Sequence, residues 1–247
     1  MGFISILTAS LFLSIAAGAS DDDCKPSQIH IAGGRDPTTE MTISWVTKSQ
    51  CSPSRVKFGT NSKKLSSVAG SDDPPLQYNQ YTRKLGNYTS PFIHHVTIQK
   101  LSSNQKYFYD IIDGSGGDKG SGDPYSFTTA PNAGSYPLKF GVVGDLGQTG
   151  DSKLTARHME TQGLRAILHA GDMAYADCYH PRWDSWFELV QPLAATTPWY
   201  VVVGNHEIEH NMESGELFLA YESRFKMPAV KPAVREKMSH YTSCSPR

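Results

Sequence analysis

Short runs of alternating apolar and polar residues follow one another between residues 26 and 130. In Met41–Thr47, for example, the first, third and fifth residues are large and apolar, and their neighbours are mostly polar. A period of two, with clusters of Gly, Asn, Asp and Pro between the runs, is typical of antiparallel strands. The pattern predicts an immunoglobulin- or fibronectin III-like β-sandwich over 26–130, with Trp45 in the core and Tyr107 at a strand corner.

The pattern changes from residue 138 onward, where longer apolar runs alternate with segments of helical period. The expected elements are strands at 139–143, 166–169 and 199–203 and helices at 152–162, 181–193 and 214–224. Asp151 is a possible cap of the first helix. Strands that alternate with helices indicate a parallel sheet, so we expect an α/β domain over 138–247. Residues 131–137 then form the linker, and the Gly-rich stretch 114–122 is expected to be a flexible loop.

The first residues form an apolar leader. No charge occurs from Phe3 to Ala17, and Ala17-Gly18-Ala19 is followed at once by an acidic run. This is typical of a secretory signal peptide over 1–19. The alternative is a membrane anchor, but an apolar run of about 15 residues is short for spanning a bilayer. We therefore expect a protein that is secreted, or delivered to a vacuole or lysosome, with no membrane contact after cleavage.

Composition narrows the range of partners. The formal net charge is −1, which argues against a nucleic-acid partner. Four cysteines in an oxidising compartment allow three pairings, and Cys24–Cys51 within the first domain is one possible bridge. Asn87 begins an Asn-Tyr-Thr glycosylation sequon, which has meaning only for a secreted chain.

Each expected strand of the α/β domain ends in a motif with side chains that suit metal chemistry. The motifs are Gly144-Asp145-Leu146-Gly147, Gly171-Asp172-Met173-Ala174-Tyr175 and Gly204-Asn205-His206-Glu207. Ligands of open α/β sheets bind beyond the carboxyl ends of the strands, so the three loops are expected to converge. Carboxylates, a phenol, an amide and an imidazole are hard or borderline metal ligands.

Two bound cations would suit phosphoryl transfer. A carboxylate such as Asp172 can bridge two ions about 3.5–4 Å apart, and such a pair activates water and neutralises charge on a phosphate. The alternative interpretation is that each Gly-Asp pair is a turn or a helix cap. Three such motifs in this order are harder to explain as turns, and the sequence predicts a joint site.

The succession G-D-x-G, G-D-x-x-Y and G-N-H-E behind a β-sandwich resembles the purple acid phosphatases, within the metallophosphoesterase superfamily. Tyr175 is the discriminating residue, because the generic superfamily pattern lacks this tyrosine. The resemblance implies that Asp145 and Tyr175 bind a ferric ion and that Asp172 bridges two metals. It further implies that Asn205 binds a divalent ion (iron, zinc or manganese) and that His206 contacts the phosphate.

The implied activity is hydrolysis of small-molecule phosphate monoesters at acidic pH, with a homodimer as a possible assembly. Three neighbouring residues have less certain roles. Glu207 either orients His206 or simply begins the next helix, and the second is favoured. His169 is expected to lie buried against the loops rather than to bind metal, and His210 lies outside the matched positions.

The family also has V-x-x-H and G-H-x-H motifs further along, which supply three histidine ligands. After His206 the sequence contains only His210 and His240, and neither stands in such a motif. We therefore expect an incomplete α/β domain in a C-terminally truncated chain. The alternatives to an acid phosphatase are a non-catalytic secreted glycoprotein and a phosphodiesterase or nucleotide pyrophosphatase of the same superfamily.

Overall fold

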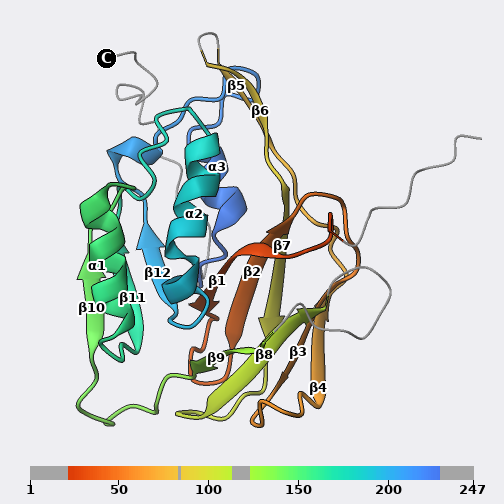
Figure 1. The fold of residues 1–247 in the computed structure, drawn as a ribbon, viewed down its shortest axis with the longest axis vertical. Helices are drawn as coiled ribbons and strands as arrows, with labels where there is room; N and C mark the ends of the chain where they lie inside the picture. The colour runs from red at the N-terminus through yellow and green to blue at the C-terminus, as the bar shows by residue number, and fades with distance from the viewer. Residues whose placement is uncertain (1–21, 83–84, 113–122, 229–247) are drawn as a thin grey trace, which may run out of the picture.

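The structure, a computed structural model, describes residues 22–82, 85–112 and 123–228 (Figure 1). The expected signal peptide at 1–19 and the Gly-rich loop at 114–122 lie outside the described residues. Within these ranges the chain forms an all-β part followed by an α/β part. None of the helices in the described ranges is long and apolar enough to cross a membrane.

The first part is a β-sandwich, as the alternating pattern predicts. One sheet has the order β1-β2-β7, the other has the order β4-β3-β8-β9, and β5 and β6 form a separate hairpin. The bounds are β1 Ser27–Gly33, β2 Met41–Thr47, β3 Ser54–Gly59, β4 Ser67–Ser71, β5 Asn79–Thr82, β6 Gly86–Thr89, β7 Phe92–Ile98, β8 Lys106–Ile112 and β9 Tyr125–Thr128. All pairings in these sheets are antiparallel.

The sandwich core confirms the expected positions of its aromatic residues. Trp45 is buried between the two sheets in one cluster with Val56 and Tyr109. The hydroxyl of Tyr107 accepts a hydrogen bond of 2.9 Å from the backbone N–H of Ser102, which fixes the corner before β8. A Cys24–Cys51 disulfide closes the N-terminal end of the sandwich, so the pairing considered from the sequence is present.

The second part has a parallel sheet in the order β10-β11-β12. Its elements are β10 Phe140–Val143, α1 Gly150–Glu160, β11 Ala166–Ala170, α2 Pro181–Ala194, β12 Trp199–Val202, the 3-10 helix η1 Asn205–Glu207 and α3 Leu219–Arg224. The two longer helices, α1 and α2, pack against each other and cover one face of the sheet (Figure 1).

Two helix starts differ from the expectation. The first helix is capped by Thr149, not Asp151, because Thr149 and Ser152 form a reciprocal capping box. The last helix begins at residue 219 instead of 214. The side chain of Asn211 accepts hydrogen bonds from the backbone N–H groups of Glu213 and Ser214, which holds this segment in a turn.

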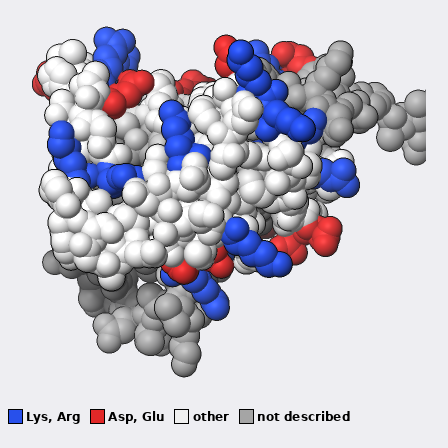
Figure 2. Space-filling view, turned by 90° about the horizontal axis from the view of Figure 1, so that it is seen from below, with Lys and Arg blue, Asp and Glu red and all other residues white. Residues whose placement is uncertain are grey.

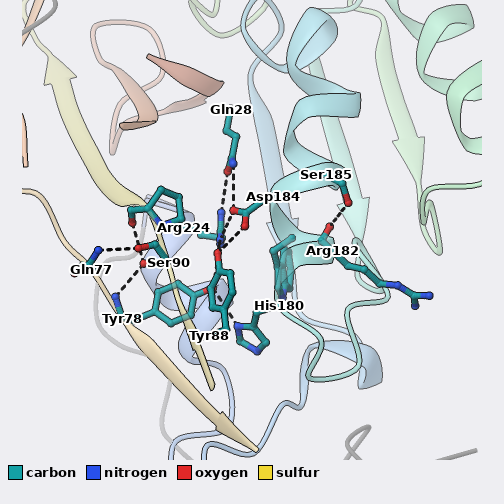
Figure 3. A network of polar contacts seen from close by, with 12 residues as sticks. Gln28, Gln77, Tyr78, Tyr88, Ser90, His180, Arg182, Asp184, Ser185 and Arg224 are labelled. Carbon is teal, nitrogen blue, oxygen red and sulfur yellow. Dashed lines mark hydrogen bonds and ion pairs between the residues drawn. The ribbon is translucent and has the colours of Figure 1, made fainter. Parts of the chain in front are cut away.

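The two parts share an extensive interface, with β1 against both α2 and β12. At its centre lies Arg224, which is 1% exposed (Figure 3). Its guanidinium donates to Asp184 and Tyr88, both at 2.8 Å, and to Gln28 at 2.9 Å. One buried cation thus joins β1, the β5-β6 hairpin, α2 and α3.

Charged side chains are distributed without segregation on the face of the molecule in Figure 2. Lysine and arginine side chains lie among aspartate and glutamate side chains there. This mixture agrees with the near-zero net charge of the sequence.

Candidate metal centre

The three motif loops lie at the carboxyl ends of three adjacent parallel strands, β10, β11 and β12. Two motif glycines allow the second and third loops to touch. A Cβ atom on Gly171, whose φ is +85°, would lie 2.6 Å from the backbone nitrogen of Gly204. A Cβ on Gly204 would in turn collide with Asp172. Residues without side chains are therefore required for this close approach.

The structure brings the predicted site residues together. The phenol of Tyr175 donates a hydrogen bond of 2.9 Å to Asp145 Oδ1, which joins the first and second loops. The backbone N–H of His206 donates to Asp172 Oδ1 at 2.8 Å, which joins the second and third loops. The rings of Tyr175 and His206 lie 4.3 Å apart between centroids. Asn205 precedes His206 at the start of η1 and is exposed at the same edge.

A further carboxylate holds the imidazole of His206. Asp177 Oδ1 lies 2.6 Å from His206 Nδ1, and both side chains are partly exposed. This contact fixes the ring and leaves Nε2 on its opposite side. Asp177 is not among the site residues that the sequence predicts. The only available signal was its place two residues after the motif tyrosine, and no spacing rule shows that it reaches the third loop.

The protonation state of Tyr175 follows from its surroundings. Partial burial raises the pKa of its phenol to about 12, and the hydrogen bond to Asp145 and the charge of Asp172 act in the same direction. At neutral pH the phenol therefore keeps its proton and donates a hydrogen bond to Asp145. Asp145 and Asp172 differ in access to solvent, since Asp145 is exposed and Asp172 is 9% exposed.

Glu207, His169 and His210, the other residues considered near the motifs, all have structural contacts. Glu207 lies in η1, and its carboxylate accepts hydrogen bonds from three backbone N–H groups. His169 is buried in contact with Trp186 and Trp199, as expected for a residue that packs behind the loops. The carbonyl of His210 accepts a hydrogen bond from Gln80 of the sandwich.

The gathered donors fit hard metal ions. They are the carboxylates of Asp145 and Asp172, the phenol of Tyr175 and the amide of Asn205. Oxygen donors of these kinds suit ferric iron and the harder divalent ions. Among the described residues there is no group of three or more His, Cys, Asp or Glu side chains arranged to hold a metal.

Two family models match the chain. Residues 26–129 match the N-terminal domain of purple acid phosphatases, and residues 138–245 match the calcineurin-like phosphoesterases. Purple acid phosphatase 18 of Arabidopsis thaliana is 32% identical over 245 residues, which cover 92% of this chain and 52% of that protein. Another relative from the same plant, named Fe(3+)-Zn(2+) purple acid phosphatase 12, is 34% identical over 82% of this chain and 43% of its own length.

A solved structure shares the fold. The purple acid phosphatase PPD1 isolated from yellow lupin (Lupinus luteus) seeds superposes with a TM-score of 0.66 at 19% identity, over 83% of this chain and 41% of that chain. The chain spans about half the length of the curated relatives it matches.

Proposed function

Because this chain belongs to the purple acid phosphatase family, we propose that its three-loop edge binds two metal ions and serves the hydrolysis of small phosphate monoesters at acidic pH. The observation that carries the proposal is the convergence of three loops distant in sequence. Asp145, Asp172, Tyr175 and His206 are joined by direct contacts between loops. A set of independent turns would give no such connection.

The proposed ligands are Asp145 and Tyr175 for a ferric ion, Asp172 as the bridge and Asn205 for a divalent ion such as iron, zinc or manganese. One relative is named for an Fe(3+)-Zn(2+) pair, which supports this assignment. When bound, such a pair supplies positive charge that acidifies water and neutralises the phosphate. The burial of Asp172 suits the bridging role, because a carboxylate with little access to solvent interacts strongly with nearby cations.

His206 is proposed to contact the phosphate through Nε2. Asp177 holds Nδ1 at 2.6 Å, so the ring has one orientation and its free nitrogen faces away from Asp177. A ring held in this way can be placed against the phosphate oxygen on which charge develops as the ester bond breaks.

The test uses the 247-residue chain and its Asp172→Ala variant. Metal content is measured by mass spectrometry after loading with iron and zinc, and hydrolysis of p-nitrophenyl phosphate is followed at acidic pH. We expect two metals per chain and a loss of at least about 100-fold in kcat with Asp172→Ala. Glu188→Gln, on the exposed side of α2, is the control for an unrelated carboxylate. A folded chain without bound metal and without turnover would contradict the proposal for these residues.

A further inference from the structure

The second motif loop, residues 172–178, has an unusual backbone. Asp172, Tyr175, Asp177 and Cys178 have φ values of +52°, +49°, +48° and +69°. Side-chain-bearing residues rarely adopt this left-handed region, and several of them in one short loop persist only where the surroundings hold them. Such a loop requires partners that fix its conformation.

Glu207 holds the beginning of this loop. Its Oε2 accepts hydrogen bonds from the backbone N–H groups of Asp172, at 2.8 Å, and Gly204, at 2.7 Å. Its Oε1 accepts from the N–H of Met173 at 2.9 Å. The side chain is buried, with 1% exposure. One carboxylate therefore ties the start of the second loop to the third loop.

Glu209 holds the end of the same loop. Its Oε1 accepts from the backbone N–H of Cys178 at 2.8 Å, and its Oε2 accepts from the indole N–H of Trp183 at 2.8 Å. Glu209 is 2% exposed, and Trp183 is anchored in α2. Two glutamates separated by one residue thus fasten both ends of the 172–178 loop, one to the third loop and the other to a helix.

The residues between these two fastenings are those that the proposed site uses. Asp172, at one end, accepts from the backbone of His206, and Asp177, near the other, contacts the His206 ring. Between them, Tyr175 reaches across to Asp145. A shift at either end of the loop would move a proposed metal ligand and the partner of His206 together.

We propose that Glu207 and Glu209 are positioning residues that hold the 172–178 loop in its metal-binding conformation before any metal is present. The inference rests on the proposed function, because it assigns the loop's conformation a role in binding metal. A purely stabilising role would leave the metal affinity of a folded variant unchanged. The positioning role predicts that the affinity falls when either glutamate is replaced, even in a chain that remains folded.

The first variant is Glu207→Gln in the metal-free 247-residue chain. The two carboxylate oxygens accept three hydrogen bonds, whereas a glutamine amide has one oxygen and turns its NH2 group toward a backbone N–H. We expect the amides of Asp172, Met173 and Gly204 to exchange with deuterium about tenfold faster or more, with no change in the β-sandwich. Glu188→Gln makes the same chemical change at an exposed position and is the matched control.

The second measurement is Zn2+ affinity by calorimetry, under conditions where circular dichroism shows each variant to be folded. We expect Glu207→Gln to bind Zn2+ about 10–100-fold more weakly than Glu188→Gln. Should Glu207→Gln fail to fold, Glu209→Gln provides the test, because a single amide oxygen replaces the two carboxylate oxygens that accept from Cys178 and Trp183. There the faster exchange is expected at Cys178.

The outcomes separate the two proposals. Unchanged amide exchange in the loop together with unchanged Zn2+ affinity would overturn the positioning role. Faster exchange spread evenly over the whole chain, with full Zn2+ affinity in the folded fraction, would also overturn it. A wild-type chain that binds no metal overturns the proposed function instead. In that case amide exchange in the loop decides whether the two glutamates fix its conformation. Unchanged exchange in the glutamate variants would refute this role.

Discussion

The β1-β2-β7 sheet and the β10-β11-β12 sheet, called the first and second sheet below, are covered in the opposite way to what their sequences indicate. Strand β2 alternates between apolar and polar residues, yet all of its residues are buried. The strands of β10-β11-β12 are largely apolar, yet several of their alternate residues are exposed; Val142 is 72% exposed and Val202 is 59% exposed. The pattern of polar and apolar residues along a strand therefore shows which side chains need hydrogen bonds on each face. It does not show whether another element covers that face.

The polar face of the first sheet is buried because its hydrogen bonds are satisfied within the protein. Thr42 pairs with Thr97 across β2 and β7, and Ser44 bonds to Nδ1 of His95. His95 Nε2 then reaches the carbonyl of Ser223 at the end of α3, 3.0 Å away. Buried polar groups are tolerated when they have such partners. The side chains that face α3 thus form an interface between the two parts.

On one face of the second sheet, Tyr200 is partly buried beside Gly33 of β1. The rest of this face is largely exposed. It consists of alternate side chains on all three strands, namely Phe140, Val142, Leu168 and Val202. The opposite face packs on α1 and α2 and includes Ile167, Trp199 and Val201. Parallel sheets are usually covered on both faces, whereas much of this face is exposed in the part of the chain that the structure describes.

Breaking the interface should have the largest effect. Replacement of Arg224 by methionine removes the buried cation and its hydrogen bonds to Asp184, Gln28 and Tyr88, which keep only the bonds that they make to one another. We expect a loss of about 3–5 kcal/mol in the free energy of unfolding, because one member of a buried ion pair is lost. Urea denaturation measures this change.

Arg157→Met, on the exposed side of α1, is the control for Arg224→Met and should change stability by less than about 0.5 kcal/mol. Addition of Asp184→Asn to Arg224→Met should recover part of the loss, because it removes a partly buried charge that has lost its cation. Equal stability of Arg224→Met and Arg157→Met would show that the network does not join the two parts in solution.

Most of the fold could be predicted from the sequence, but little of this interface could. Period-two runs locate the sandwich strands, and strand-end motifs locate the loops, because both depend on neighbours along the chain. Arg224 is in contact with Gln28, which lies 196 residues away, and no local pattern marks either residue. The same limit applies to Asp177 and Glu209, whose partners in the site lie on other loops.

Acid should weaken the same interface by a smaller amount. Burial lowers the pKa of His95 from 6.5 to about 4, so the folded state keeps the imidazole neutral while the unfolded chain becomes protonated. The unfolded state therefore binds more protons between pH 6.5 and about 4, and stability falls as the pH is lowered through this range. Other buried histidines with lowered pKa values, among them His94 and His169, act in the same direction.

His95→Gln isolates the contribution of His95. Glutamine can accept from Ser44 and donate to Ser223 but does not titrate. We expect the loss of unfolding free energy between pH 7 and pH 4.5 to be smaller in this variant by about 1–2 kcal/mol. Urea midpoints at several pH values measure it. An identical pH dependence of the variant and the wild type would mean that the polar face of the first sheet is open to water.

Substitution on the exposed face of the second sheet should have the smallest effect. Val142→Lys places a charge on edge strand β10 at a position that is already in contact with water, so we expect a change in unfolding free energy within about 0.5 kcal/mol. Binding of a hydrophobic dye should decrease, because the lysine interrupts the apolar surface. Val56→Lys, at a fully buried position of the sandwich, is the contrasting variant and should abolish folding. A loss of 2 kcal/mol or more with Val142→Lys would show that this face is covered in solution, and the contrast between the two sheets would then not hold.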